Sequence, residues 1–180
     1  MNIYTVKLKS MTPLIQNVPD SPDSIERAHW SEDGRAFIPQ AAIKFALVDA
    51  AKMTTRRGQG MSTTPSAVRI TTSIHVLAPI ILHHTRQTVR MLEFIMTSTP
   101  KSGVVRCGKR RLPCFDEWQG SVDIAVTDGT ITRGIIHGLF TVAGLMVGIG
   151  AGRPKYGNIF GKFTIKDIVP VPDRKVVHGM

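Results

Sequence analysis

Strand-like and helical segments follow one another along this chain in an order that few folds accommodate. Residues 3–10, "IYTVKLKS", alternate apolar and polar side chains as a half-buried strand does. The segment 37–53, "FIPQAAIKFALVDAAKM", instead places apolar residues at helical spacing, namely Ile43, Ala46, Leu47, Ala50 and Ala51. Pro39 suits the first turn of such a helix. We therefore expect a first strand, a long connection and an amphipathic helix.

The middle of the chain predicts a group of strands. Residues 67–82 are rich in Val, Ile and Thr, which favours an extended chain interrupted at Pro79. Thr, Val and Arg alternate through the first half of 85–96, so we favour a strand over a helix there. Segment 120–129 alternates the buried-type residues Val122, Ile124 and Val126 and ends on an Asp-Gly turn.

A second helix is expected over 130–147, capped by Thr130 or Asp128. One face of this helix would carry Ile131, Ile135, Leu139, Val142 and Met146. Its glycines weaken a helix, so we expect them to allow close packing on a sheet. The uncharged span 134–150 is short for a membrane crossing, and a core helix is the better interpretation, with His137 as a satisfied core histidine. A last strand follows at 160–169.

Two helices separated by several strands are typical of an α+β domain. We expect a ferredoxin-like or RRM-like antiparallel sheet with two helices on one face, formed as a single domain over 1–180. Residues 16–36 and 54–66 are rich in turn formers, and we expect them to be mobile loops rather than packed elements.

The charge of the chain points to an anionic partner. Lys and Arg number 23 against 13 Asp and Glu, which gives a net charge of +10. Five of the acids lie between 20 and 33, so the rest of the chain is more basic than the total indicates. Nucleic acid, an anionic membrane surface and an acidic protein all fit this charge by sign alone.

Cys107 and Cys114 are the two cysteines, and the chain opens without a cationic and apolar leader. Both observations favour a reducing, cytoplasmic setting with no membrane association. We expect two free, semi-buried thiols, although a disulfide across a hairpin is the alternative.

Residues 148–163, "GIGAGRPKYGNIFGKF", combine glycines with cations and aromatic residues and contain no acid. The glycine spacing matches neither the dinucleotide fingerprint nor the P-loop. A glycine-rich backbone beside Arg153, Lys155, Tyr156 and Lys162 suits a sugar-phosphate strand, with a base stacked on an aromatic ring. The alternative is a turn that packs the second helix against the last strand, and the two interpretations are compatible.

A second basic segment, 102–115, has the pattern of a hairpin with Gly108 and Lys109 near its tip. Its cations are Arg106, Lys109, Arg110 and Arg111. Such an arm can follow a nucleic-acid backbone, and Arg56 and Arg57 on the other cationic loop add to it. A solvated hairpin is the alternative.

Catalytic patterns are scarce. His83 and His84 are adjacent, so on a strand they would point to opposite faces and could not bind one metal. His29 beside Trp30 is the one candidate for a general base, and the sequence places no partner for it. We therefore expect no enzyme activity, no metal and no cofactor.

Two stretches resemble the RAMP superfamily, the ferredoxin-like proteins that include backbone and processing subunits of CRISPR effector complexes. "FIPQAAIKFALVDAAK" resembles the helix entry of that superfamily, and "AGLMVGIGAGRPKYGNIFGKF" resembles its glycine-rich loop. Ala41 and Ala42 stand where the family has small hydroxyl residues, and Phe45 stands where it has glycine. The resemblance implies binding of single-stranded nucleic acid, RNA before DNA, with Lys44, the glycine-rich loop and the basic hairpins along the backbone.

The resemblance also implies side-by-side assembly of copies on one strand, alone or with other protein subunits. A stand-alone phage or mobile-element relative that binds or anneals single-stranded DNA fits the length equally well. We expect phosphate contacts from the basic residues and base stacking on Tyr156 or Trp30. Two alternatives remain, a metal-independent guide-RNA-processing nuclease with His29 as base and a basic protein that docks an acidic protein.

Overall fold

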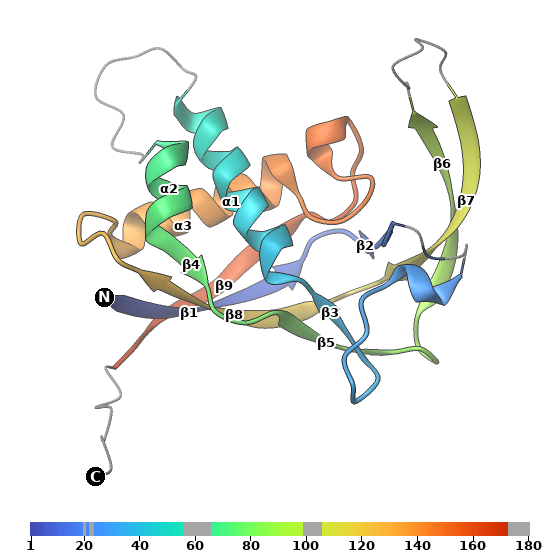
Figure 1. Ribbon diagram of the computed structural model, residues 1–180, viewed down its shortest axis with the longest axis horizontal. Helices are drawn as coiled ribbons and strands as arrows, with labels where there is room; N and C mark the ends of the chain where they lie inside the picture. The colour runs from blue at the N-terminus through green and yellow to red at the C-terminus, as the bar shows by residue number, and fades with distance from the viewer. Residues whose placement is uncertain (20, 22–23, 56–65, 99–105, 173–180) are drawn as a thin grey trace.

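The computed structural model describes residues 1–19, 21, 24–55, 66–98 and 106–172. Its main sheet has four antiparallel strands in the order β4 (Ile74–Val76), β8 (Gln119–Val126), β1 (Asn2–Ser10), β9 (Phe163–Val171). The helices α1 (Gln40–Thr55), α2 (Ala67–Ser73) and α3 (Arg133–Val142) lie on one face of this sheet (Figure 1). The α+β class expected from the sequence is confirmed.

The core lies between this sheet and the helices. All five residues expected on the apolar face of the first helix are at most 1% exposed. Val6 and Leu8 of β1 and Val122 and Ile124 of β8 meet them from the sheet. The strands expected near 3–10, 120–129 and 160–169 are confirmed as β1, β8 and β9. Their alternating apolar and β-branched residues suit strands of a sheet with one buried face.

The helix α2 was not expected, since its Val, Ile and Thr residues favour a strand. Local and tertiary contacts override this preference. The Ser66 side chain caps the first turn by accepting a hydrogen bond from the Arg69 amide, 3.3 Å. At the other end the Lys44 ammonium of α1 donates to the carbonyl oxygens of Ile70 and Thr71, both at 2.9 Å, and to that of Ile74. These bonds join α1 to the last turn of α2 and to the first residue of β4.

The second helix was expected over 130–147. The α-helix α3 covers only Arg133–Val142, and a π-helical turn, Ala143–Val147, follows it directly. The cap is Thr132, whose side chain accepts from the Ile135 amide at 3.4 Å, and not Thr130 or Asp128. The wider turn changes the helical phase. Met146 is therefore 56% exposed instead of buried. His137 lies in α3 before this turn, outside the buried face that contains Ile136 and Phe140, and is exposed rather than a core histidine.

Glycine allows the close packing expected of this segment at one position. A Cβ on Gly144 would lie 2.1 Å from the carbonyl oxygen of Phe163 on β9, so only glycine fits there. A Cβ on Gly138 would meet nothing within 4 Å, and a Cβ on Gly134 would make an ordinary contact of 3.7 Å with Thr132 Oγ1. Among the described residues, no helix has the length and apolar character that crossing a membrane requires.

A second sheet contains β2 (Leu14–Ile15), β7 (Arg106–Phe115) and β6 (Arg90–Ser98), in that order, and β6 and β7 form a long curved ribbon (Figure 1). The predicted hairpin at 102–115 was wrong. Gly108 and Lys109 lie within β7, where they pair with Met96 and Ile95 of β6. The ribbon pairs residues 90–98 with residues 106–115, and the pairing of two strands cannot be inferred from the sequence pattern of either one alone.

The two cysteines lie seven residues apart on the same strand β7. At about 3.3 Å per residue they are about 23 Å from each other, too far for a disulfide. Cys114 is a free, buried thiol, as expected. The side chain of Cys107 lies outside the described part of the structure.

The described part of 16–36 is packed, contrary to the expected loop. It contains a 3-10 turn at Ile25–Arg27 and the strand β3 (Arg35–Ile38), which pairs with β5 (Ile80–Thr85). The Gln16 amide is 5% exposed and donates to the Phe37 carbonyl, 2.9 Å, and accepts from the His29 amide, 2.8 Å. Buried side chains therefore hold this segment despite its turn-forming composition.

Candidate nucleic-acid interface

Ile15 joins the glycine-rich segment to the basic strand β7. Its backbone pairs with Cys114 on one side and forms a bridge with Ala151 on the other. The Ala151 amide donates to the Ile15 carbonyl oxygen, 2.7 Å. Neighbouring strands lie about 4.8 Å apart, so the backbones of Ala151 and Cys114 are separated by about 10 Å. The two basic segments that the sequence singled out thus share one short strand.

The glycines of this loop serve packing, which confirms one of the two interpretations offered by the sequence. Gly150 has a φ of +77°, and a Cβ there would lie 2.3 Å from the Ile15 carbonyl oxygen. Gly161 has a φ of +69°, and its Cβ would lie 1.8 Å from the carbonyl oxygen of Ile149. The Gly161 amide donates to Pro13, 2.8 Å, and so fastens the end of the loop to the chain before β2.

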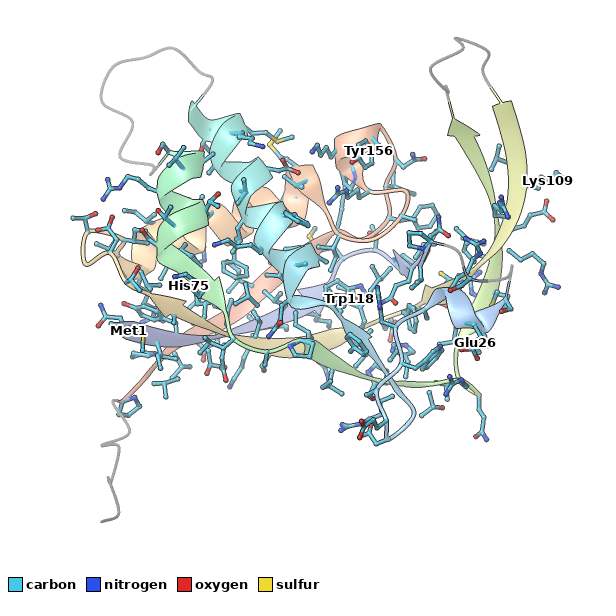
Figure 2. All side chains as sticks on the ribbon, viewed as in Figure 1. Met1, Glu26, His75, Lys109, Trp118 and Tyr156 are labelled. Carbon is cyan, nitrogen blue, oxygen red and sulfur yellow. The ribbon has the colours of Figure 1, made fainter. Side chains whose placement is uncertain are left out.

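Arg153 and Tyr156 form a cation-π pair on the exposed part of the loop. The guanidinium carbon of Arg153 lies 5.0 Å from the Tyr156 ring centroid, and its Nη2 donates to the hydroxyl at 3.2 Å. This hydrogen bond and the positive charge lower the pKa of Tyr156. The ring is 64% exposed, so it remains accessible to a stacking partner. Figure 2 shows Tyr156 on the loop beside α1.

Lys155 ties the same loop to α1. Its Nζ lies 2.6 Å from Oδ2 of Asp49, and the Asp49 side chain is only 15% exposed. The Lys155 ammonium also lies 5.7 Å from the Tyr156 ring centroid. Lys155 therefore has an internal carboxylate partner and positions the loop, a role that the sequence did not indicate.

Phe45 is an exposed aromatic residue of α1 that was not expected to contact a ligand. It is 63% exposed and lies on the same helical face as Asp49, four residues later. Since Asp49 binds Lys155 of the loop, Phe45 is on the face of α1 that borders the loop. The sequence could have indicated this exposed ring, because Phe45 is a large apolar residue that lies outside the apolar stripe of the helix.

Strand alternation divides the cations of β7 between two faces. Arg110 shares a face with the buried Leu112 and Cys114, which pack with Ile15, Ala151 and Phe160 next to the loop. Lys109 and Arg111 lie on the opposite face, where Nζ of Lys109 is 3.0 Å from Oε1 of Glu93. Figure 2 shows Lys109 on this strand. The pair is exposed, so it holds Lys109 weakly.

The remaining expected binding residues are placed differently. Lys44 is engaged at the end of α2, and burial lowers its pKa. Lys162 is half-buried beside the loop, with its backbone amide bonded to Thr12, 2.9 Å. Arg56 and Arg57 lie outside the described residues, and Arg106 is described only as part of the strand β7.

Trp30, the second stacking candidate, is half-buried and packs against the core, whereas Tyr156 is exposed. The Trp30 Nε1 donates to the Ile25 carbonyl oxygen, 3.0 Å, and Arg86 lies over the Trp30 ring at 4.9 Å from the centroid, as Arg153 does over Tyr156. Of the two stacking candidates, Tyr156 is therefore the accessible one.

His83 and His84, the adjacent histidines, lie on β5 and differ in exposure. His84 is buried and His83 is exposed, although their ring centroids are 4.0 Å apart. Within the described ranges no three His, Cys, Asp or Glu side chains form a group suited to a metal ion. Burial lowers the pKa of His29, the candidate base, whose ring centroid is 5.3 Å from that of Phe37.

No protein-family model matches this chain, and no curated protein is significantly similar to it in sequence.

Proposed function

We propose that this protein binds single-stranded nucleic acid along the sugar-phosphate backbone, with RNA favoured over DNA and without catalysis. Phosphates would contact Arg110, Arg153 and other cations of β7, and bases would stack on Tyr156 and Phe45. Copies would lie side by side on one strand, with or without other subunits.

The observation that carries this proposal is the double pairing of Ile15. It holds Cys114 of the cationic strand β7 and Ala151 of the glycine-rich loop about 10 Å apart, one on each side of Ile15, so that the two basic segments are neighbours in the fold. Cations on both elements and exposed aromatic rings on one are the combination that single-strand binding uses. The net charge of +10 supplies the long-range attraction.

The strand order supports a ferredoxin-like unit. β1, α1, β4, β8, α3 and β9 follow the β-α-β-β-α-β order, and β8 lies between β1 and β4 in the sheet. We infer that α2 is an addition to this unit. The RAMP resemblance, based on the α1 entry and the glycine-rich loop, agrees with this inference and remains part of the proposal.

Reversing two charges on β7 tests the proposal. Arg110→Glu combined with Arg111→Glu should abolish binding of labelled single strands, while the thermal unfolding temperature stays close to that of the wild type. The control is Lys7→Glu with Lys9→Glu, an equal change in net charge at exposed positions of β1. Unchanged affinity in the β7 variant would rule out this interface. Equal losses in both double variants would show that net charge acts without a defined site.

A further inference from the structure

A cavity of about 340 Å³ opens beside the glycine-rich loop. Its walls come from three parts of the chain, which are β2 with the segment after it, the end of β3 with the start of α1, and the loop itself. The residues that matter here are Leu14, His29, Ile38, Pro39, Ala42 and Tyr156. This volume is within the range of small-molecule sites, about 300 to 1,000 Å³.

The lining combines apolar walls with few polar groups. Leu14 and Ile38 are almost completely buried, and Pro39 and Ala42 at the start of α1 complete an apolar surface. The Gln16 amide, which also borders the cavity, is used at both ends by Phe37 and His29. Gln16 therefore holds the wall in place, and the Asn17 side chain, which also lines the cavity, accepts from Arg27 through its Oδ1 at 2.6 Å. The other polar side chains of the lining are the His29 ring and the Tyr156 hydroxyl.

These two groups suit the edge of a flat heterocycle. Burial lowers the pKa of His29, so its ring is neutral at pH 7 and offers one N–H donor and one acceptor nitrogen. The Tyr156 hydroxyl accepts from Arg153 and retains its own proton to donate. Base edges present both donors and acceptors, which this pair can match.

The surroundings of the opening favour a ligand that is apolar and flat at one end and anionic at the other. Tyr156 belongs to the lining, and Arg153 lies against the Tyr156 ring at 5.0 Å. A base inside the cavity would leave its phosphate near the Arg153 guanidinium. We propose that the cavity takes one unstacked base of the bound strand, so that the protein reads a nucleobase as well as the backbone. This inference rests on the proposed function.

Filling the cavity tests the inference. Ala42→Leu adds volume inside the cavity, and Ala41→Leu makes the same change at the exposed neighbouring position of α1. Each protein is titrated with a single-stranded oligomer and with an oligomer of the same backbone and length whose bases are removed. Ala42→Val is a smaller replacement for the case in which Ala42→Leu does not fold.

The wild type and Ala41→Leu should bind the base-bearing oligomer more tightly than the base-free one, through the base in the cavity and through the bases stacked on Tyr156 and Phe45. Ala42→Leu should lower this ratio by about tenfold, the contribution expected of one base, and leave base-free binding unchanged, and Ala42→Val should lower it less. If the cavity variants keep the full ratio, the base site is wrong and backbone binding stands. If the wild type binds neither oligomer, the proposed function fails, and the base site fails with it.

Discussion

Asp49 on α1 holds Lys155 of the glycine-rich loop through a 2.6 Å contact between Oδ2 and Nζ. The same carboxylate lies 3.8 Å from Lys52, one turn further along the helix. One acid therefore neutralises cations on the border of the proposed interface and fixes the position of the loop on the helix.

Removing this carboxylate should strengthen binding. Asp49→Asn frees the Lys155 ammonium for phosphate, so we expect an affinity gain of about threefold to tenfold at low salt and a salt slope steeper by about one. The measurement is a titration at several salt concentrations. Asp167→Asn on β9 changes the net charge equally and serves as the control. A loss of affinity in Asp49→Asn would mean that loop position matters more than charge.

The two faces of β7 should differ in importance. Arg110→Gln removes a cation from the face shared with Leu112 next to the loop, and we expect affinity to fall about fivefold to tenfold. Arg111→Gln removes the same charge from the opposite face and should cost about twofold. The reverse ranking would place the bound strand on the outer face of the ribbon.

Glycine is required at position 150 of the loop and dispensable at position 138 of α3. Gly150→Ala combines a positive φ with a Cβ 2.3 Å from the Ile15 carbonyl oxygen, so we expect a loss of about 3 kcal/mol or more in unfolding free energy. Gly138→Ala meets nothing within 4 Å and should gain about 0.5 to 1 kcal/mol. Urea unfolding of both variants gives these values, and equal stabilities would contradict the described loop packing.

Cys114 should make the protein less stable in alkali. Burial raises the pKa of this thiol to about 11, and the nearby Asp116 carboxylate acts in the same direction. Between the usual thiol pKa and 11, the unfolded chain loses the proton while the folded chain keeps it. The free energy of unfolding should therefore fall by about 1 to 2 kcal/mol from pH 8 to pH 10, relative to Cys114→Ala.

Urea unfolding of the wild type and of Cys114→Ala at both pH values measures this difference. Parallel pH dependence of the two proteins would show that the thiol ionises as readily in the folded state. Other titrating groups are common to both proteins and cancel in the comparison.

Elements whose local pattern and burial agree were predictable from the sequence. The apolar stripe from Ile43 to Ala51 predicted α1, and the apolar-polar alternation in β1 and β8 predicted the two central strands of the sheet. The helix α2 was missed because its β-branched residues form a helix only with the Ser66 cap and the Lys44 ammonium. The first of these is local, but the second comes from a residue 26 positions earlier.

The candidate site was predictable in part. Arg153, Tyr156 and the β7 arginines could be predicted as binding residues from local composition. Both segments are rich in cations and lack acids, and the first also contains glycines and aromatic residues. Their partners were not visible. Asp49 lies 106 residues from Lys155, and the pairing of Ile15 with both Cys114 and Ala151 depends on the folded chain.

The most direct test is fluorescence anisotropy of labelled single-stranded RNA and DNA of equal length, titrated at several salt concentrations, with a gel of the same samples. We predict tight binding at low salt, a linear decrease of log affinity with log salt concentration, stronger binding of RNA, and intact strands. No binding to either strand at low salt would contradict the account and favour an acidic protein partner. Cleaved strands without added metal would contradict the absence of catalysis.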